Sequence, residues 1–366
     1  MSRNVLQTMA SIEEVTKSYV DAEDICRITN VRRHIQAAGD EEPVCDFVKH
    51  AKYKCFIRNG ISIFIFFYND QKLLFLPRVF CDPIDKIGYV LSDNIAITQG
   101  ATMLAISSKN LPISDNVTSL RIIEEYLGLD DSVDGENVII PFSSIAELFK
   151  PYLLYIIDDS RFQIAFEEDI NRLSCFLLSH VETSLSTETY SAIQQLSLLL
   201  SSRSIAGSIL NGFQSSLIDY AFLQFYQCIE YLFQLNLCFI ISEDHSIPIE
   251  TAIHIFLAHE FKLSESEHLY RVLKDNAPLQ AIEDLLSKNN VSQEEIKDKY
   301  RAASTFIYRL RCNIAHLRYN HEELLVSDWR QCIESLVNII TSIYTKRDTN
   351  ITHICISNNS WKRIDI

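Results

Sequence analysis

The chain has 366 residues, enough for about two domains at the usual size of roughly 100 to 200 residues each. Apolar residues make up 47% of the chain and charged residues 22%, a globular mixture that argues against general disorder. The formal net charge of −15 disfavours a broad, nonspecific grip on nucleic-acid phosphates, so any contact with nucleic acid has to be local.

The N-terminus and the cysteines indicate the cellular compartment. Residues 1–10 lack the cationic start and the apolar stretch of a signal peptide, so we do not expect export. The cysteines include no Cys-x-x-Cys pair, and we interpret them as reduced thiols of a cytoplasmic protein. The apolar segment 217–241 is interrupted by polar residues such as Asp219 and Gln224, which are costly in hydrocarbon. It is therefore expected to be a buried helix and not a membrane span.

Residues 1–158 are expected to form an α+β domain with a regulatory, sensing or partner-binding role. Aromatic and β-branched runs at 62–67 and 72–79 flank Asn69-Asp70 and predict a β-hairpin. Further strands are expected at residues 95–98, 103–107, 138–140 and 153–157. Helices are expected at residues 12–21, 119–127 and 144–148.

After residue 167 the apolar pattern becomes helical. We expect a helical connector over 159–202, an all-α domain over 203–346 and a C-terminal tail over 347–366, with a short strand at 351–356. Helices are expected at residues 168–178, 190–201, 214–239, 249–261, 265–274 and 279–286.

Two long amphipathic helices are predicted near the end of the chain. Ser292 and Glu295 fit a capping box that opens the first helix. Its apolar residues recur at alternating steps of four and three: Ile296, Tyr300, Ala303, Ile307, Leu310 and Ile314. The second helix follows Ser327-Asp328, carries one apolar stripe over 329–344, and is closed by the basic pair at 346–347, which suits the negative end of a helix dipole.

The segment 308–316 reads Tyr-Arg-Leu-Arg-Cys-Asn-Ile-Ala-His and lies at the end of the first of these helices. Four residues separate Arg311 from His316, and six separate Arg309 from His316. At about 100° per residue, Arg309, Asn313 and His316 share the face opposite the apolar stripe, while Arg311 lies on its flank. The sequence therefore gathers two arginines, an amide and a histidine at one helix end.

This segment resembles the motif of the HEPN superfamily, in which Arg is followed after four to six residues by His on a late helix of a helical bundle. The Ile-Ala-His ending is similar to HEPN domains of bacterial toxin and antiphage systems. The run 222–233 resembles an early HEPN helix with an acidic residue, here Glu230, so that the resemblance covers 203–346. One departure is that Cys312 stands directly after the Arg, where many active members have a polar residue, and Asn313 follows it.

The resemblance implies a metal-independent endoribonuclease that needs no cofactor, a toxin-like effector of antiphage defence or of a toxin–antitoxin system. Its substrate would be RNA, its working unit a homodimer through the helical domain, and its protein partner an antitoxin or another defence component. His316 would be the base or acid, because the pKa of His, about 6.5, lies near neutral pH. Arg311 would hold the phosphoryl oxygens, with Arg309 and Asn313 in support and Glu230 as counter-charge to the arginine.

Two alternatives remain open from the sequence. The helical domain is a non-catalytic HEPN module that binds RNA, nucleotide or a protein partner, or the N-terminal α+β region is the active domain and the helices serve dimerisation. His254 and His259 lack the spacing of metal ligands, so no metal site is expected. No glycine-rich phosphate loop is present, which leaves ATPase or dinucleotide chemistry without support.

Overall fold

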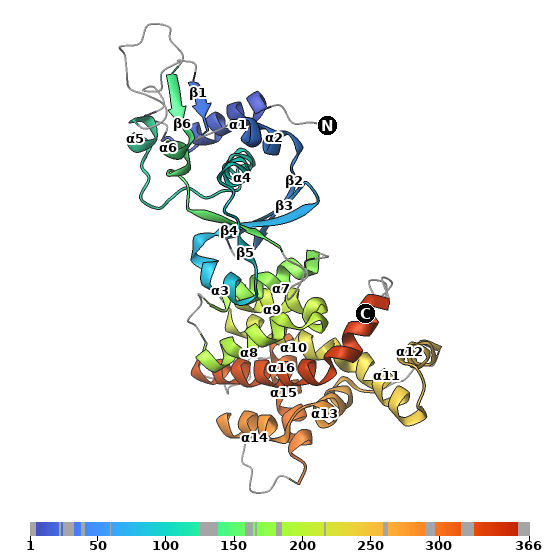
Figure 1. Ribbon diagram of the computed structural model, residues 1–366. Coiled ribbons are helices and arrows are strands. Elements are labelled where there is room, and N and C mark those ends of the chain that lie inside the picture. Colours follow the sequence, from blue (N-terminus) through green and yellow to red (C-terminus); the bar gives the residue numbers. More distant parts are fainter. Residues whose placement is uncertain are drawn as a thin grey trace. The chain divides into compact units, whose positions relative to one another are not determined.

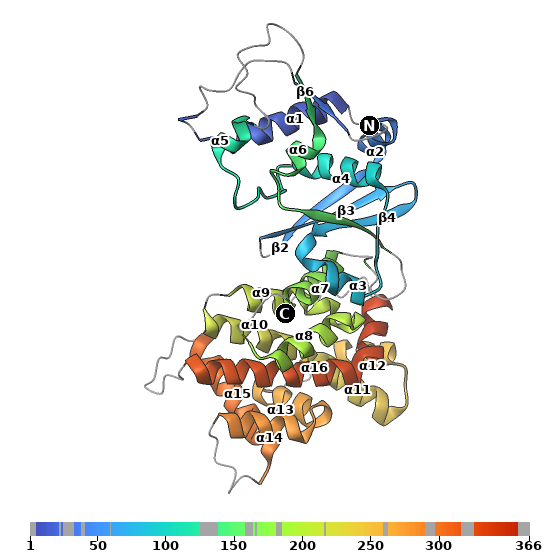
Figure 2. The ribbon, with the colours of Figure 1, turned by 60° about the vertical axis from the view of Figure 1, so that its left-hand side comes forward.

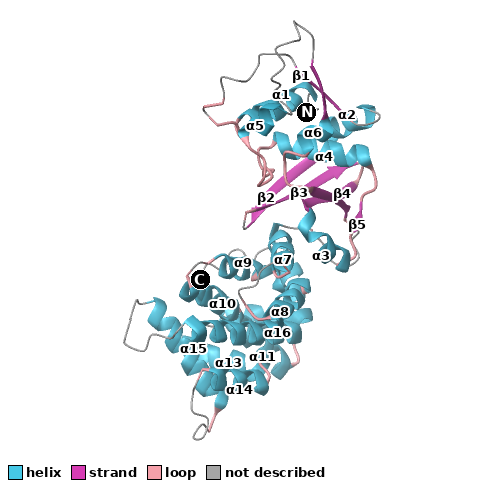
Figure 3. Cartoon of the chain, turned by 90° about the vertical axis from the view of Figure 1, so that its left-hand side faces the viewer, coloured by secondary structure: helices cyan, strands magenta, loops and turns pink. Residues whose placement is uncertain are grey.

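The chain divides into two compact units, Met1–Gln163 and Ile164–Ile366, each with its own elements (Figure 1). The computed structural model describes residues 5–21, 23–24, 33–37, 41–58, 60–124, 138–157, 164, 167–180, 185–215, 217–258, 263–289, 297–315 and 326–357. The first unit combines strands with helices, and the described part of the second unit contains helices only (Figure 3). The predicted α+β class is confirmed.

The first unit is built on a five-stranded antiparallel sheet with strand order β2-β3-β4-β7-β5. Its strands are β2 Lys52–Arg58, β3 Ile61–Tyr68, β4 Gln71–Pro77, β5 Val90–Leu91 and β7 Tyr152–Ile156. A separate two-stranded sheet pairs β1 (Arg33–Gln36) in parallel with β6 (Val138–Pro141). The strands predicted at 62–67, 72–79, 138–140 and 153–157 are thus confirmed with small shifts, and β1, β2 and β5 were not predicted.

The predicted hairpin joins β3 to β4 through Asn69 and Asp70. Both residues have positive φ, 46° and 60° respectively. Two consecutive residues in this region make the type I′ turn, whose twist matches that of antiparallel strands and which favours Asn and Asp. Tyr68 and Gln71 close the ladder on either side of the turn. The local turn chemistry therefore sets the register of the two central strands.

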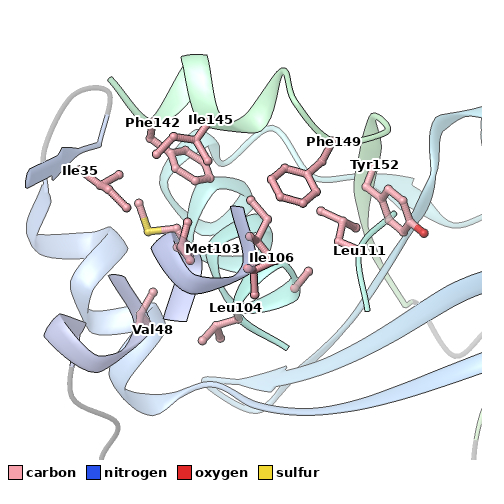
Figure 4. Close-up of a cluster of buried hydrophobic side chains, with 14 of the residues drawn as sticks. Ile35, Val48, Met103, Leu104, Ile106, Leu111, Phe142, Ile145, Phe149 and Tyr152 are labelled. Carbon is pink, nitrogen blue, oxygen red and sulfur yellow. The ribbon is translucent and has the colours of Figure 1, made fainter. Parts of the chain in front are cut away.

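Helix α4 (Ile95–Ser107) fills the core of the first unit, and the strands predicted at 95–98 and 103–107 are wrong. Asn94 caps the helix, because its side-chain oxygen accepts a hydrogen bond of 3.1 Å from the backbone N–H of Ile97. The helix is buried on several sides, and Figure 4 shows Met103, Leu104 and Ile106 of α4 among apolar side chains of other elements. An apolar run without one-sided periodicity looks the same in a buried strand and a buried helix, which explains the error.

The other helices of this unit are short. They are α1 Val5–Lys17, α2 Glu41–His50, α3 Cys81–Lys86, α5 Ser119–Ile122 and α6 Phe142–Ala146. The helices predicted at 12–21, 119–127 and 144–148 overlap α1, α5 and α6, and residues 125–127 of the second prediction lie outside the described part of the chain. Helix α2 was not predicted, because Pro43 reads as a helix breaker although proline is tolerated in a first turn.

The second unit is a helical bundle, shown from another side in Figure 2. Its helices are α7 Glu167–Leu178, α8 Thr187–Leu198, α9 Ala206–Gln214, α10 Ile218–Glu230, α11 Leu232–His245, α12 Ile249–Ala258, α13 Glu265–Asn276, α14 Leu279–Lys288, α15 Lys299–Ala315 and α16 Val326–Ser357, with a 3₁₀ turn, η4, at Leu200–Ser204. Helices α7 and α8, from the segment expected as a connector, pack against α9 and α16. The predicted capping box at 292 and 295 lies outside the described residues.

Two corrections concern α9 to α11. The single helix predicted at 214–239 is two helices, α10 and α11, that are interrupted at Tyr231, where no glycine or proline marks the break. Helix α9 was not predicted, because its glycines lower helix propensity. Gly212 has a packing reason, since a Cβ there would come within 3.0 Å of the Phe225 ring. The glycine lets α9 approach α10 closely.

Helix α16 is longer than predicted, and the strand expected at 351–356 is wrong, because the helix continues to Ser357. The basic pair expected to close the helix lies within it. The Nε of Arg347 donates to Oδ1 of Asn276 at 2.7 Å, and its guanidinium also pairs with Glu243. Ile351, one turn later, is fully buried. Tertiary contacts to α11 and α13 therefore extend the helix into the segment expected as a tail.

A buried ionic cluster joins α7, α8 and η4. Asp169 is fully buried, and its Oδ1 lies 2.8 Å from both Nη1 of Arg172 and Nε of Arg203. Arg172, itself 1% exposed, also donates to the backbone carbonyls of Ser197 and Leu198 at 3.2 and 3.1 Å. The carboxylate thus compensates two guanidinium groups, and one of these satisfies carbonyls at the end of α8.

We expect Asp169→Ala to lower the free energy of unfolding by about 3–5 kcal/mol, because it leaves a buried guanidinium without its counter-charge. Chemical denaturation with circular dichroism measures the change. The control is Glu267→Ala, which removes two solvent-exposed ion pairs, with Arg271 and Arg301, and should change stability little. Equal losses in the two variants would contradict a structural role for the buried cluster.

Candidate functional site

Helix α15 presents two distinct faces. Ala303, Ile307 and Leu310 are buried against the bundle, whereas Arg309 and Asn313 are exposed. The arrangement expected from helical periodicity, with the apolar stripe inward and Arg309 and Asn313 outward, is therefore observed. His316 is the residue directly after the described end of the helix, so its placement lies outside the described residues.

Arg311 lies on the flank of this helix and is held by groups from two other helices. Its Nε forms an ion pair of 3.1 Å with Oε1 of Glu265, the first residue of α13. The same oxygen accepts a hydrogen bond of 2.9 Å from the hydroxyl of Tyr226 on α10. The Arg311 guanidinium also lies 6.0 Å from the centre of the Tyr226 ring. Helices α10, α13 and α15 thus meet at one arginine, and we call Tyr226, Glu230, Glu265 and Arg311 the Arg311 cluster.

Glu265 was not predicted as a site residue. Ser264 caps α13 by accepting from the N–H of Glu267 at 3.3 Å, which places Glu265 in the first turn of the helix. An acidic residue is favoured there by the helix dipole alone, so the sequence offers a sufficient local reason for it. Only the packing of α13 against α15 brings this carboxylate to Arg311.

Glu230, the predicted counter-charge, is the last residue of α10 and is partly buried in the same cluster. Burial raises its pKa above the ordinary value, the charge of Glu265 raises it further, and the charge of Arg311 acts in the opposite direction. The charge of Arg311 thus acts on Glu230, while the short ion pair of Arg311 is formed by Glu265.

Tyr226 anchors the cluster from inside the bundle. Its side chain is 1% exposed, and its pKa is raised well above the ordinary value, first by burial and then by the hydrogen bond that it donates to Glu265. It therefore stays protonated and donates permanently. A fixed donor of this kind holds the Glu265 carboxylate in place beside Arg311.

The cluster can present a guanidinium to an anion. Its ion pair uses Nε, so the two terminal amino groups of Arg311 can donate to a further acceptor such as a phosphate. The Arg311 side chain is 26% exposed, enough for a ligand to reach it. On the neighbouring turn, the interaction with Cys312 is the largest cause of a raised pKa at Tyr308.

Within the described part of the chain, no group of three or more His, Cys, Asp or Glu side chains could hold a metal ion. None of the described helices is long and apolar enough to cross a membrane. Comparison with known proteins found no match to this chain among family models, curated sequences or solved structures. The similarity of 308–316 to the HEPN motif therefore stands on the residues themselves.

We expect Glu230→Gln to be more stable than the natural protein at about pH 7 and to lose this advantage towards about pH 4. The raised pKa means that the native state holds the Glu230 proton more tightly than the unfolded chain does. The charge of Glu230 therefore lowers stability as pH rises above the ordinary glutamate pKa. Thermal unfolding at several pH values measures the difference.

The control is Glu267→Gln, which should behave in the opposite way. The hydrogen bond from Arg301 lowers the pKa of Glu267, so its ionised form stabilises the native state above the ordinary pKa, and this contribution is lost as pH falls. Glu267→Gln is thus expected to be slightly less stable near neutral pH. A uniform effect of Glu230→Gln at every pH would show that the burial of its charge is not the cause.

Proposed function

We propose that this protein is a metal-independent endoribonuclease of the HEPN type, a toxin-like effector of antiphage defence or of a toxin–antitoxin system that acts in the cytoplasm. One observation carries the proposal. Arg311 is fixed by Glu265 on the flank of α15, Arg309 and Asn313 are exposed on the outer face, and His316 follows directly in sequence. These are the side chains that transfer of a phosphoryl group within RNA requires.

The proposed reaction uses the 2′-hydroxyl of the RNA as nucleophile. His316 accepts its proton, the 2′-oxygen attacks the adjacent phosphorus, and the bond to the 5′-oxygen breaks. The 5′-oxygen leaves as a hydroxyl after it receives a proton, and the other product ends in a 2′,3′-cyclic phosphate. Arg311 stabilises the negative charge that builds on the phosphoryl oxygens.

A symmetric homodimer would complete the site. Arg309 and Asn313 project from the exposed face of α15, and a two-fold axis through that face sets the same patch of a second copy against it. One histidine can then accept the proton while its counterpart donates one. Opposed arginines repel each other, and Glu265 and Glu230 supply counter-charges from within each protomer.

A non-catalytic module that binds RNA, nucleotide or a protein partner is the second candidate. The Arg311 cluster holds two carboxylates, Glu230 and Glu265, against one guanidinium, and this excess of negative charge disfavours a phosphate. Binding of RNA by the natural protein without any cleavage would favour this candidate over the ribonuclease.

We expect His316→Ala and Arg311→Ala each to reduce RNA cleavage by at least about 100-fold, because one removes the proton acceptor and the other the phosphate donor. Arg309→Ala should reduce RNA cleavage by a smaller factor. Cleavage of total RNA by the purified variants measures the effect, and circular dichroism shows whether each variant is folded. Full activity of folded His316→Ala would contradict the assignment.

The matched control is Arg301→Ala, since Arg301 is an exposed arginine of the same helix that lies two turns from Arg309 and pairs with Glu267. Its replacement should leave cleavage unchanged. Activity should also persist in EDTA, and the products should end in 2′,3′-cyclic phosphate. Loss of activity in EDTA that magnesium restores would point instead to a metal-dependent nuclease.

The dimer gives a separate expectation. Light scattering at micromolar concentration should report about twice the chain mass, and specific activity should fall on dilution through the range in which the dimer dissociates. Asn313→Arg, which adds a charge to the proposed two-fold face, should weaken the dimer and cleavage together. A monomer with constant specific activity at all dilutions would exclude the shared site.

A further inference from the structure

The N-terminal unit carries a basic and aromatic row across one face of its sheet. Directly opposite residues in an antiparallel pair project to the same face. Lys52 of β2 is paired with Phe67 of β3, and Phe67 is paired with Lys72 of β4, so the three form one row across three strands. Phe67 is 40% exposed, and Lys52 is exposed beside it. Lys54 projects from the same face two residues further along the edge strand.

A pocket of about 490 Å³ opens at this end of the sheet. It is lined by His50, Lys52, Phe67 and Lys72 and by Tyr68 and Asp70 at the hairpin. A volume of this order falls in the range of small-molecule sites, roughly 300 to 1,000 Å³. The pocket therefore adds a concave surface to the row of cations and aromatic rings.

Asp46 of α2 fixes the wall of this pocket. Its Oδ2 accepts a hydrogen bond of 2.5 Å from the Tyr68 hydroxyl, and its Oδ1 lies 2.9 Å from Nδ1 of His50. The bond from Tyr68 lowers the pKa of Asp46, so the carboxylate stays ionised and retains both partners. The Tyr68 ring also packs on Phe47, with ring centres 4.8 Å apart. The wall is thus held in place without a ligand.

The chemistry of the row selects a ligand with both an aromatic ring and negative charge. An exposed aromatic ring between cations binds a base by stacking and a phosphate by charge, as in proteins that hold single-stranded nucleic acid. The pocket lining contains two lysines, Lys52 and Lys72, and one carboxylate, Asp70, and Lys54 follows on the edge strand. The lining thus has more lysines than carboxylates, although the whole chain has a net charge of −15.

We infer that this pocket binds a nucleotide, with the base on Phe67 and the phosphate held by Lys52 and Lys72. The nucleotide is either free or one unit of a single-stranded RNA. In the second case, Lys54 meets the next phosphate along the edge strand. The inference does not depend on the proposed cleavage at Arg311, because the pocket is built entirely from residues of the first unit.

The test is fluorescence anisotropy with the full chain and a labelled 12-nucleotide 2′-O-methyl RNA, which lacks the free 2′-hydroxyl needed for cleavage. Phe67→Leu keeps an apolar side chain but removes the stacking ring, and it should weaken binding by about fivefold or more, while Phe67→Trp should retain it. Lys52→Ala should weaken binding and reduce the slope of log affinity against log salt by about one. Lys86→Ala, an exposed lysine of α3 in the same unit, should change nothing.

Competition with AMP and with inorganic phosphate distinguishes the two sources of the ligand. If AMP displaces the probe and Lys54→Ala binds normally, the ligand is a free nucleotide. If AMP does not displace the probe and Lys54→Ala weakens binding of the probe, the ligand is single-stranded RNA. Displacement by phosphate at the concentration at which AMP acts would contradict base stacking and overturn the inference.

Absence of both RNA and AMP binding by the natural protein would also overturn it, as would unchanged affinity in folded Phe67→Leu and Lys52→Ala. Lysines on an edge strand can instead serve to prevent strand addition between molecules. In that case Lys52→Ala and Lys54→Ala would form larger particles in light scattering and would bind RNA as the natural protein does. Failure of cleavage with normal binding of 2′-O-methyl RNA would count against the ribonuclease alone.

Discussion

The helical unit depends on the burial of one long helix, α16. Leu336 and Ile339 near its middle are fully buried, and helices α8, α10 and α14 all pack against it. Burial of each large apolar side chain contributes roughly 1.5–3 kcal/mol, so the stripe on α16 supplies a large share of the driving force for this unit. Helices α10 and α14 also contact α15. The position of Arg311 is therefore fixed indirectly by a helix that contributes none of the residues of its cluster.

Local signals in the sequence were sufficient where an element depends on few distant contacts. The hairpin at Asn69 and Asp70 follows from turn chemistry, and the faces of α15 follow from helical periodicity. Helix α4 was mistaken for strands because burial on several sides removes the period that separates the two structures. The end of α16 was predicted too early, because Arg347 forms a hydrogen bond with Asn276, a residue 71 positions away. Such a contact cannot be predicted from the local sequence pattern.

The candidate site shows the same division. Arg309, Asn313 and Arg311 were assigned to the outer face and flank of α15 from spacing alone. Glu230 was expected as a counter-charge to the arginine from the resemblance of 222–233 to an early HEPN helix, and its charge acts on Arg311. Glu265 was not predicted as a site residue, because an acidic residue is favoured by the helix dipole in the first turn of α13. Glu265 both suits the first turn of α13 and pairs with Arg311, and only the first of these roles can be inferred from the sequence.

The shared oxygen in the Arg311 cluster has a consequence for how the arginine can move. Tyr226 and Arg311 both bind Oε1 of Glu265, and Tyr226 is fixed in the core. If the guanidinium turns towards an incoming anion, the carboxylate still keeps the phenolic hydrogen bond and is not left bare. Release of Arg311 then leaves Oε1 of Glu265 with its hydrogen bond from Tyr226, which lowers the cost of the movement. Tyr226 thus holds the Glu265 carboxylate in position whether or not Arg311 is paired with it.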